Sequence, residues 1–254
     1  MKVSTNMFKA ALHENHAQIG LWLGSTSAYI AELCASTGYD WVLIDGEHAP
    51  NTVQTVLAQL QAVAVYPVAP VVRPVDSDPA LLKQLSDIGG RNFLIPMIES
   101  GEEASKVVSA LRYPPQGTRG IGTALARAAL WGGVTDYLAK ANDELCILCQ
   151  VETVAGLAAL DDILHVEGVD GVFIGPADLA ASLGYPGQSG HPVVVEAITS
   201  AMQKIVASGK AAGILQVDVA QAKKYLELGA TFVAVGVDMV LLRRQCLDLL
   251  ENFK

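Results

Sequence analysis

The sequence predicts an α/β protein built as a (β/α)₈ barrel, the TIM barrel. Eight short apolar segments rich in Val, Ile, Leu and Phe alternate with eight segments of helical periodicity. The length of 254 residues matches the roughly 250 residues typical of this barrel. The apolar segments are continuous, as expected for parallel strands covered on both faces. A doubly wound open sheet is the alternative, which the strand count and the lack of a G-x-G-x-x-G turn disfavour.

The two patterns place the elements along the chain. Strands are expected over residues 18–24, 41–48, 69–74, 92–98, 145–152, 169–176, 211–216 and 231–238. Helices are expected over residues 28–36, 51–63, 78–89, 101–113, 153–164, 191–209, 218–229 and 239–253. A further helix over residues 6–14 precedes the first strand, and we expect residues 1–254 to form a single barrel domain.

Helix boundaries carry signals of their own. Asp78, which is followed by proline, and Asp218 are typical helix starts, because a carboxylate can accept hydrogen bonds from the free N–H groups there. Gly89, Gly209 and Gly229 stand where helices should end, since glycine adopts the left-handed backbone of a helix terminus without strain.

The longest insertion, residues 114–143, lies between the fourth helix of the barrel and the fifth strand. It begins with the Gly/Arg-containing run PPQGTRGIG. Backbone amides in such a run could hold a phosphate, but the Gly-Lys-Ser/Thr sequence of a nucleotide-binding loop is missing. We therefore expect a loop on the substrate side of the barrel or at an interface.

Composition excludes several classes of partner. The chain is 51% hydrophobic and 17% charged, and 26 acidic against 17 basic residues give a net charge of −9. The electrostatic field of a protein with this negative net charge does not attract nucleic acid or an anionic membrane surface. The longest apolar run, residues 62–72, is too short to span a bilayer and contains two prolines. The first residues lack the pattern of a secretory signal, so we expect a cytoplasmic protein.

The four cysteines form no disulfide framework, which agrees with this compartment. Cys146 and Cys149 have the C-x-x-C spacing of a redox pair. They lie within the apolar run LCILCQVE, however, where residues three apart on a strand point to opposite faces. We expect buried thiols at both positions.

Polar residues close five of the expected strands. In a TIM barrel the active site lies at the carboxyl ends of the strands, so these residues are the candidates for chemistry. They are Asp45, Glu47 and His48; Arg73; Gln150 and Glu152; Asp178; and Asp238. Gln150 and Glu152 are two residues apart and therefore point to the same face of their strand.

Glu152 and Asp178 are the candidate metal ligands. Two carboxylates from neighbouring strands, completed by water or substrate oxygens, suit Mg²⁺ or Mn²⁺. The alternative is that both carboxylates serve helix N-termini, because both precede helical segments. The amide of Gln150 beside them, with a histidine and an arginine across the rim, favours the metal site.

His48 is the candidate general base, because an imidazole titrates near neutrality. The alternative, a surface loop histidine, is disfavoured by the neighbouring Asp45, Glu47 and Arg73. Arg73 closes its strand, where a fixed cation can bind a carboxylate and stabilise a developing oxyanion. Its alternative role is a structural ion pair with Asp45 or Glu47.

The positions of the lysines separate two kinds of lyase chemistry. A Schiff-base enzyme needs a desolvated lysine on a barrel strand. Every lysine of this chain falls on an expected helix, a connector or a terminus. Metal-assisted chemistry on an oxygen-rich anion is therefore the expectation.

Seven segments of the sequence together resemble one family. They are WVLIDGEHAPN, PVVRP, IPMI, RYPPQGTRGIG, QVET, EGVDGVFIGPADLAASLG and FVAVGVD. They resemble the metal-dependent pyruvate aldolases of the HpcH/HpaI family, among them the 4-hydroxy-2-oxoheptane-1,7-dioate aldolases. The resemblance extends from about residue 7 to the C-terminus and implies a barrel of the phosphoenolpyruvate/pyruvate type.

The resemblance also implies roles for individual residues. It implies that Glu152 and Asp178 bind a divalent metal ion, Mg²⁺, Mn²⁺ or Co²⁺, and that no organic cofactor is needed. It implies that Gln150 and the backbone at Ala177 and Asp178 hold the pyruvate part of the substrate.

The remaining implied residues act on the proton and the aldehyde. His48 is implied as the base and Arg73 as the transition-state stabiliser. Asp87 is implied to pair with the histidine and to raise its basicity, and Trp22 and Leu215 to lie near the substrate.

The implied activity is the reversible cleavage of 4-hydroxy-2-oxoheptane-1,7-dioate into pyruvate and succinic semialdehyde, a step of aromatic degradation. Alternatives are a 2-keto-3-deoxy-L-rhamnonate or 2-dehydro-3-deoxyglucarate aldolase, a lyase acting on CoA esters, and a non-catalytic metabolite-binding barrel. The implied assembly is a homohexamer, a trimer of dimers with exchanged C-terminal helices. Residues 123–136 and 185–191 are where we expect relatives to differ in aldehyde preference.

Overall fold

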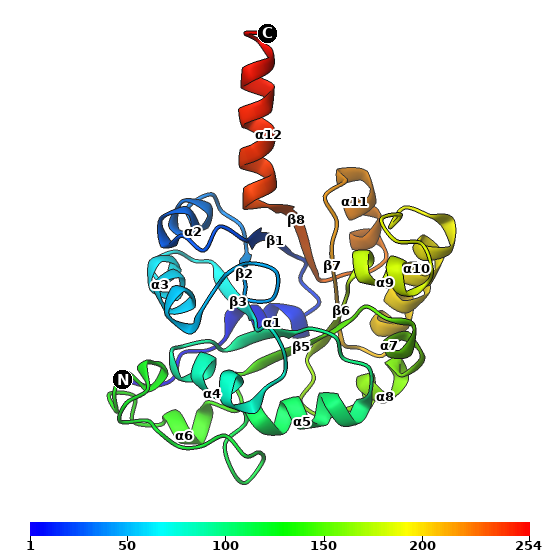
Figure 1. Cartoon of the computed structure of the whole chain (residues 1–254). Coiled ribbons are helices and arrows are strands. Elements are labelled where there is room, and N and C mark those ends of the chain that lie inside the picture. Colours follow the sequence, from blue (N-terminus) through cyan, green and yellow to red (C-terminus); the bar gives the residue numbers. More distant parts are fainter.

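Eight parallel strands close into a barrel in sequence order, β1 to β8 (Figure 1). The computed structural model describes residues 1–254. The strands are β1 Gln18–Leu23, β2 Trp41–Asp45, β3 Ala69–Arg73, β4 Asn92–Ile95, β5 Cys146–Val151, β6 Gly171–Ile174, β7 Ala211–Leu215 and β8 Phe232–Val237. Pairing of β8 with β1 closes the ring. The predicted TIM-barrel fold is confirmed, and each expected strand contains one of these strands.

Seven of the expected helices are present as single helices. They are α2 Ala28–Ala35, α3 Val53–Val63, α4 Pro79–Asp87, α5 Gly101–Leu111, α10 Pro192–Ala207, α11 Val219–Glu227 and α12 Asp238–Glu251. Asp78 and Asp218 accept hydrogen bonds from the first turns of α4 and α11, as predicted. Gly89, Gly209 and Gly229 have positive φ angles of 115°, 80° and 100°, which confirms them as residues at helix ends.

The structure differs from the expectation in three places. The helix expected over residues 153–164 is divided into α7 (Val154–Ala158) and α8 (Leu160–His165), because Ala159 has a non-helical backbone with φ −90° and ψ 4°. A short helix α9 (Pro176–Ser182) follows β6 and was not expected. The insertion 114–143 holds a 3₁₀ turn, Arg127–Ala129, and a short helix, α6 (Tyr137–Lys140).

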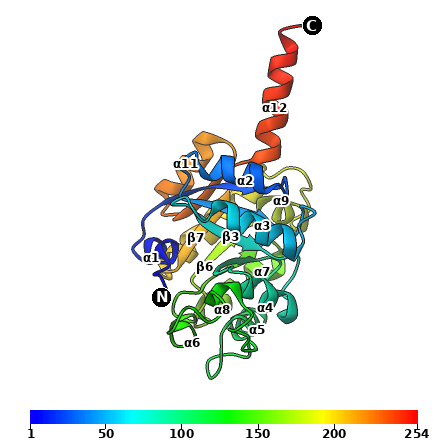
Figure 2. The ribbon, with the colours of Figure 1, turned by 90° about the vertical axis from the view of Figure 1, so that its left-hand side faces the viewer.

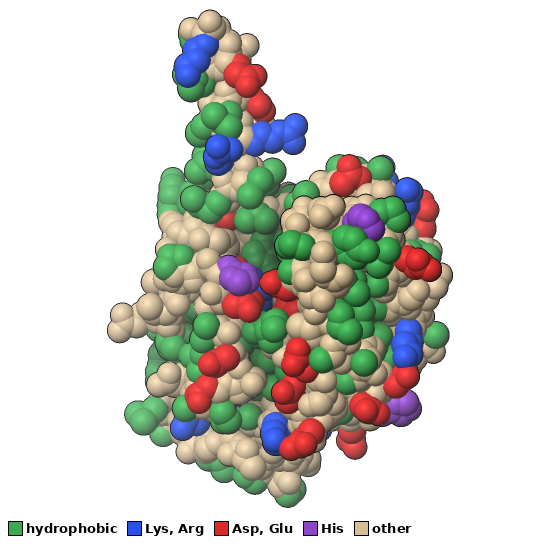
Figure 3. All heavy atoms as spheres, turned by 45° about the vertical axis from the view of Figure 1, so that its right-hand side comes forward, with side chains coloured by type: hydrophobic (Ala, Val, Ile, Leu, Met, Phe, Trp, Pro, Cys, Tyr) green, Lys and Arg blue, Asp and Glu red, His purple; other side chains and the backbone are tan.

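Helix α12 projects away from the barrel instead of packing against it (Figures 1 and 2). Asp238 is its only buried residue, and its carboxylate accepts hydrogen bonds from the N–H groups of Gly24 and Ser25. Figure 3 shows hydrophobic side chains on this helix and at its base. None of the helices combines the length and the apolarity needed to cross a membrane.

The apolar core has two layers, as a TIM barrel requires. Side chains inside the barrel, among them Trp41, Phe173 and Phe232, form one cluster. A larger cluster fills the space between the strands and the surrounding helices. Cys146 lies in the inner cluster and Cys149 in the outer one, and burial raises the pKa of both thiols, that of Cys149 to about 12. These are buried thiols and not a redox pair.

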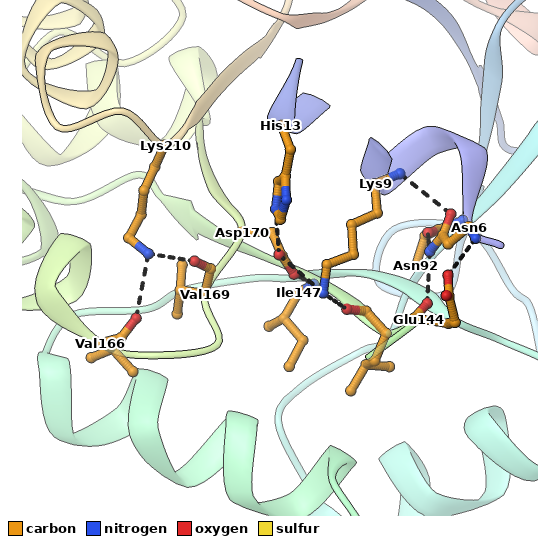
Figure 4. Close-up of polar contacts among 11 residues, drawn as sticks. Asn6, Lys9, His13, Asn92, Glu144, Ile147, Val166, Val169, Asp170 and Lys210 are labelled. Atoms are coloured by element: carbon orange, nitrogen blue, oxygen red, sulfur yellow. Dashed lines mark hydrogen bonds and ion pairs between the residues drawn. The ribbon is translucent and has the colours of Figure 1, made fainter. Parts of the chain in front are cut away.

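Helix α1 (Met7–His13) covers the amino-terminal end of the barrel (Figure 2). Phe8 and Leu12 pack into the inner cluster. The polar contacts of this end centre on Asp170 (Figure 4). Its Oδ1 lies 3.3 Å from Lys9 Nζ and 3.0 Å from His13 Nε2, and its Oδ2 accepts a 2.9 Å hydrogen bond from the Ile147 N–H. The amino-terminal end is therefore closed, and the opposite end remains for a site.

We expect Asp170→Ala to lower the free energy of unfolding by about 3 kcal/mol, because it removes the only carboxylate paired with the largely buried Lys9 ammonium and leaves the Ile147 N–H without its side-chain acceptor. Guanidinium unfolding followed by circular dichroism measures the loss. Asp161→Ala is the matched control, since Asp161 pairs with Lys204 on the surface, where the side chains are 61% and 44% exposed. That control should cost less than about 1 kcal/mol. Equal losses in the two variants would contradict this account of the barrel floor.

Candidate active site

The carboxyl ends of the strands surround a pocket of about 280 Å³. Its lining residues are Trp22, Asp45, His48, Arg73, Gln150, Glu152, Phe173, Gly175, Pro176, Ala177, Asp178, Leu215 and Val237. Figure 3 shows a histidine and several acidic side chains along the recess on this side of the molecule. Of the residues with a predicted catalytic, metal-binding or substrate-binding role, only Asp87 lies outside this pocket. Of the other strand-end acids, Asp45 lines the pocket, whereas Glu47 and Asp238 do not.

Arg73 is held rigidly at the pocket floor by Asp45, its neighbour in register on β2. Its Nε and Nη2 donate hydrogen bonds of 3.0 and 2.7 Å to the two carboxylate oxygens of Asp45. Its Nη1 lies 2.7 Å from Glu47 Oε2. The guanidinium also lies over the ring of Trp22, 5.0 Å from its centroid. The structural ion pair considered for Arg73 is thus present, and the same side chain lines the pocket.

Asp45 is the residue that organises this corner. Besides Arg73, it accepts hydrogen bonds from Trp22 Nε1 at 3.1 Å and from the backbone N–H groups of Glu47 and His48 at 3.0 and 3.3 Å. Burial alone would raise its pKa, but hydrogen bonds and the charge of Arg73, helped by the other donors, outweigh burial and hold the pKa of Asp45 below its usual value. Burial raises the pKa of Glu47, which the charges of Arg73 and His48 only partly oppose.

His48 stands at the rim, with its side chain 66% exposed. Its side chain has one ion-pair partner, Glu47, whose Oε2 is 3.7 Å from Nε2. Sequence reasoning noted Asp45 and Glu47 as strand-end acids but gave neither a role at the site. The register of two adjacent strands, which places Asp45 beside Arg73, is the signal that could have revealed the role of Asp45.

Glu152 is buried, at 2% exposure, directly after β5. Its Oε2 accepts a 2.5 Å hydrogen bond from Gln150 Nε2, and its Oε1 a 3.0 Å bond from the Met97 N–H. Met97 has a left-handed backbone with φ 55°, a strained conformation of the kind found at functional sites. A Cβ on Gly175 would lie 2.4 Å from Glu152 Oε2, so only glycine fits opposite the carboxylate.

The capping role considered for Glu152 is wrong. The residue that caps α7 is Thr153, whose Oγ1 accepts a 3.0 Å hydrogen bond from the Gly156 N–H. Asp178 is exposed and lies in the first turn of α9, a position that also suits a carboxylate at a helix N-terminus. The two candidate ligands thus differ, since one is a buried acid and the other lies at the surface of the pocket.

The donor set fits a hard divalent cation. Burial raises the pKa of Glu152, and the nearby carboxylates of Glu47 and Asp178 raise it further, while hydrogen bonds from Gln150 and Met97 partly oppose them. No basic side chain pairs with Glu152. No group of three or more His, Cys, Asp or Glu side chains forms a metal site by itself. A cation here would therefore take two carboxylates from the chain and further oxygens from substrate and water.

Asp87 does not contact His48 within the chain. It is the last residue of α4, and its Oδ1 accepts a 2.5 Å hydrogen bond from Arg119 Nη2. The pairing with the histidine that the resemblance implies is therefore not made inside one copy of the protein.

No lysine lines the pocket. Lys210, which precedes β7, lies at the opposite end of the barrel, where its Nζ donates to the carbonyl oxygen of Val169 at 2.6 Å (Figure 4). The pocket thus offers carboxylates, an arginine and a histidine, but no amine that could form an imine with a carbonyl substrate.

The sequence profile of the HpcH/HpaI aldolase/citrate lyase family matches residues 18–244. The chain belongs to this family. It is 58% identical over 244 residues to the 2-keto-3-deoxy-L-rhamnonate aldolase of Klebsiella pneumoniae, covering 96% of this chain and 91% of that protein. It is 59% identical over 250 residues to the hydroxypyruvate/pyruvate aldolase of Deinococcus radiodurans, covering 98% of this chain and 90% of that protein.

Among solved structures, an HpcH/HpaI aldolase/citrate lyase family protein from Burkholderia cenocepacia superposes with a TM-score of 0.94 at 38% identity, covering 98% of this chain and 99% of that one. The two curated relatives are named as aldolases, which agrees with the lyase expected from the sequence. Neither name mentions the heptanedioate substrate or aromatic degradation, so these relatives give no support to that part of the expectation.

We expect Asp45→Asn to lower the free energy of unfolding at pH 7 by about 3 kcal/mol, because it leaves the buried Arg73 without its bidentate partner. The pKa of Asp45 lies below its ordinary value of 3.8, so the ion pair makes its full contribution to the free energy of unfolding at any pH above 3.8. The contribution is lost as the pH falls through the lowered pKa. The gap between wild type and variant should therefore narrow toward pH 3.

Thermal unfolding at fixed protein concentration between pH 7 and pH 3 measures this gap. Asp161→Asn is the control, because Asp161 pairs with Lys204 on the surface, where the side chains are 61% and 44% exposed. A gap that stays constant over this pH range would show that Asp45 acts by packing and not through its charge.

Proposed function

We propose that this protein is a class II aldolase that reversibly cleaves a 4-hydroxy-2-oxo acid between C3 and C4 into pyruvate and an aldehyde. The observation that carries the proposal is one pocket that combines two oxygen ligands, Glu152 and Asp178, with the fixed cation of Arg73 and no lysine. The aldolase names of the close relatives support the same reaction class.

Glu152 and Asp178 would hold the divalent ion, Mg²⁺, Mn²⁺ or Co²⁺. When bound, such an ion polarises the 2-oxo group and makes the carbonyl an electron sink. Gln150 and the backbone N–H groups of Ala177 and Asp178 would hold the pyruvate part of the substrate. In support, these two N–H groups have no acceptor within the chain and can donate to a substrate carboxylate.

His48 would take the proton from the 4-hydroxyl group, since it is the one imidazole at the pocket. Arg73 would stabilise the negative charge that develops when the C3–C4 bond breaks. Two of the five N–H groups of its guanidinium donate to Asp45. Nη1 also lies 2.7 Å from Glu47 Oε2, which leaves one N–H group on Nη1 and one on Nη2 for a substrate oxygen. The fixed geometry means that little reorganisation accompanies the reaction.

The walls of the pocket bear on the choice of substrate. Trp22, Phe173, Leu215 and Val237 form its apolar part, and Arg73 is the only lysine or arginine among its lining residues. A dicarboxylic substrate such as the heptanedioate would bring a second carboxylate for which the pocket offers no further arginine or lysine. Together with the names of the relatives, this favours a 3-deoxy-2-oxo sugar acid, with hydroxypyruvate as an alternative to pyruvate.

The purified protein should cleave 2-keto-3-deoxy-L-rhamnonate faster than 4-hydroxy-2-oxoheptane-1,7-dioate, as measured by coupled detection of pyruvate. Exhaustive chelation should abolish turnover and added Mn²⁺ should restore it. Glu152→Gln should lower kcat/KM by more than about 100-fold. Glu99→Gln is the matched control, because Glu99 is an exposed acid bonded to Thr153 outside the pocket.

Full turnover after chelation would refute the metal requirement. Inactivation by borohydride in the presence of pyruvate would point to a lysine imine, against the lining of the pocket. Faster cleavage of the heptanedioate would reverse the order of substrates while leaving the aldolase proposal in place.

We further propose that the protein assembles as a homohexamer, a trimer of dimers that exchange α12. Helix α12 exposes seven large apolar side chains, Met239, Val240, Leu241, Leu242, Leu247, Leu249 and Leu250, and Phe253 just after it is exposed as well. A mostly apolar groove of about 430 Å³ lies between α2 and the start of α12. Soluble monomers rarely expose so large a patch, and a helix from a second copy would cover it.

In such an assembly Asp87 of one copy would pair with His48 of another. Both side chains are accessible, at 28% and 66% exposure, and they make no contact within one copy. The carboxylate would then orient the imidazole and make it a stronger base, as the third group of a catalytic triad does.

Mixed assemblies test this pairing. His48→Ala and Asp87→Ala should each be nearly inactive alone. Subunits mixed by co-expression should regain about a quarter of wild-type activity, because one site in four then combines an intact His48 with an intact Asp87. The measurement is aldol cleavage per subunit after purification of the mixed species. Absence of any recovery in verified mixed assemblies would contradict the pairing between copies.

A further inference from the structure

The run PPQGTRGIG, residues 114–122, has no part in the proposed reaction, yet the fold fixes it in place. Thr118 N–H donates to the Ser109 carbonyl oxygen at 2.7 Å, and Arg119 N–H to the Arg112 carbonyl oxygen at 2.9 Å. A Cβ on Gly117 would lie 2.4 Å from the Ser109 oxygen and 2.3 Å from the Arg112 oxygen. Only glycine therefore lets the run lie so close against the end of α5.

This arrangement fixes the position of Arg119 in the fold. Its side chain is 4% exposed, and its guanidinium lies over the ring of the buried Tyr113, 4.4 Å from the centroid. Nη2 donates to Asp87 Oδ1 at 2.5 Å. Burying a guanidinium is costly and an ion pair only partly offsets that cost, so the pair is poorly explained by stability alone.

The contact engages only one oxygen of Asp87. Oδ1 is taken by Arg119, while Oδ2 accepts no hydrogen bond within the chain and the side chain remains 28% exposed. The ion pair with the buried Arg119 restrains the Asp87 carboxylate and leaves its second oxygen available to an external donor.

We propose that Arg119 is a positioning residue for the general base. It holds Asp87 so that Oδ2 faces the imidazole of His48 in a second copy of the protein, an inference that rests on the proposed function. Arg119 does not line the active-site pocket. It acts on the reaction only through Asp87.

A double-mutant cycle on the full-length assembly tests the proposal. Arg119→Gln should lower kcat about 10- to 100-fold, because misorientation of a catalytic group by a fraction of an ångström to 1 Å has effects of this size. KM should change less than about 3-fold, since no substrate contact is removed. In an Asp87→Asn background, Arg119→Gln should cost less than about 2-fold more, because the two residues act as one unit.

Chemical rescue separates positioning from loss of structure. Millimolar guanidinium ion should restore part of the activity of Arg119→Ala, and Arg119→Lys should fall between wild type and Arg119→Gln. Arg127→Gln is the matched control. Arg127 Nη1 also donates to the end of α4, to the Ile88 carbonyl oxygen at 3.0 Å, but it does not contact the carboxylate of Asp87. This control should retain kcat within about 3-fold and show no rescue.

The outcomes separate this proposal from the one on which it rests. Full kcat in Arg119→Gln with a low kcat in Asp87→Asn would overturn the positioning role and leave the aldolase mechanism intact. Multiplicative effects of the two substitutions would also overturn it. Full kcat in both single variants would remove Asp87 from the mechanism and the positioning role with it.

Discussion

Closure of the barrel by the pairing of β8 with β1 is the constraint on which the site depends. It sets Trp22 of β1 in register with Val237 of β8, and both line the pocket although more than 200 residues separate them. Within the same barrel, the pairing of β2 with β3 holds Asp45 and Arg73 side by side at the ends of these strands. Because all eight strands run parallel, their polar ends meet at one rim and can act on a single ligand.

Buried charges are balanced differently at the two ends of the barrel. At the closed end the carboxylate of Asp170 is matched by the ammonium of Lys9 and by the backbone N–H of Ile147. At the open end Arg73 is matched by Asp45 and Glu47, whereas Glu152 has only amide donors as partners. The pocket therefore carries excess negative charge although its proposed substrate is an anion. A divalent cation held there would reverse the local sign, and Arg73 would complete the reversal.

Much of the fold and of the site follows from local pattern. Continuous apolar strands, helix-start acids such as Asp78 and polar strand ends such as Glu152 need no long-range information. The break at Ala159 was missed because neither glycine nor proline marks it, and α9 because it is too short to show periodicity. The place of Asp87 against Arg119 depends on a 32-residue separation that only the folded insertion closes. Contacts between segments far apart in the chain produce no periodic pattern in the sequence, so they could not be predicted from it.

The insertion and the projecting helix point to the same physical conclusion. Three features of a single copy lack a partner. They are the exposed base at the rim, the acid with one oxygen free and the helix with an uncovered apolar face. Alone, each either costs free energy or has nothing to act on. In the proposed assembly each of the three acquires a partner of suitable chemistry. Burial of α12 would then stabilise the same oligomer that brings Asp87 to His48. Assembly and catalytic competence would therefore be thermodynamically linked, since whatever favours subunit association also favours the oriented base.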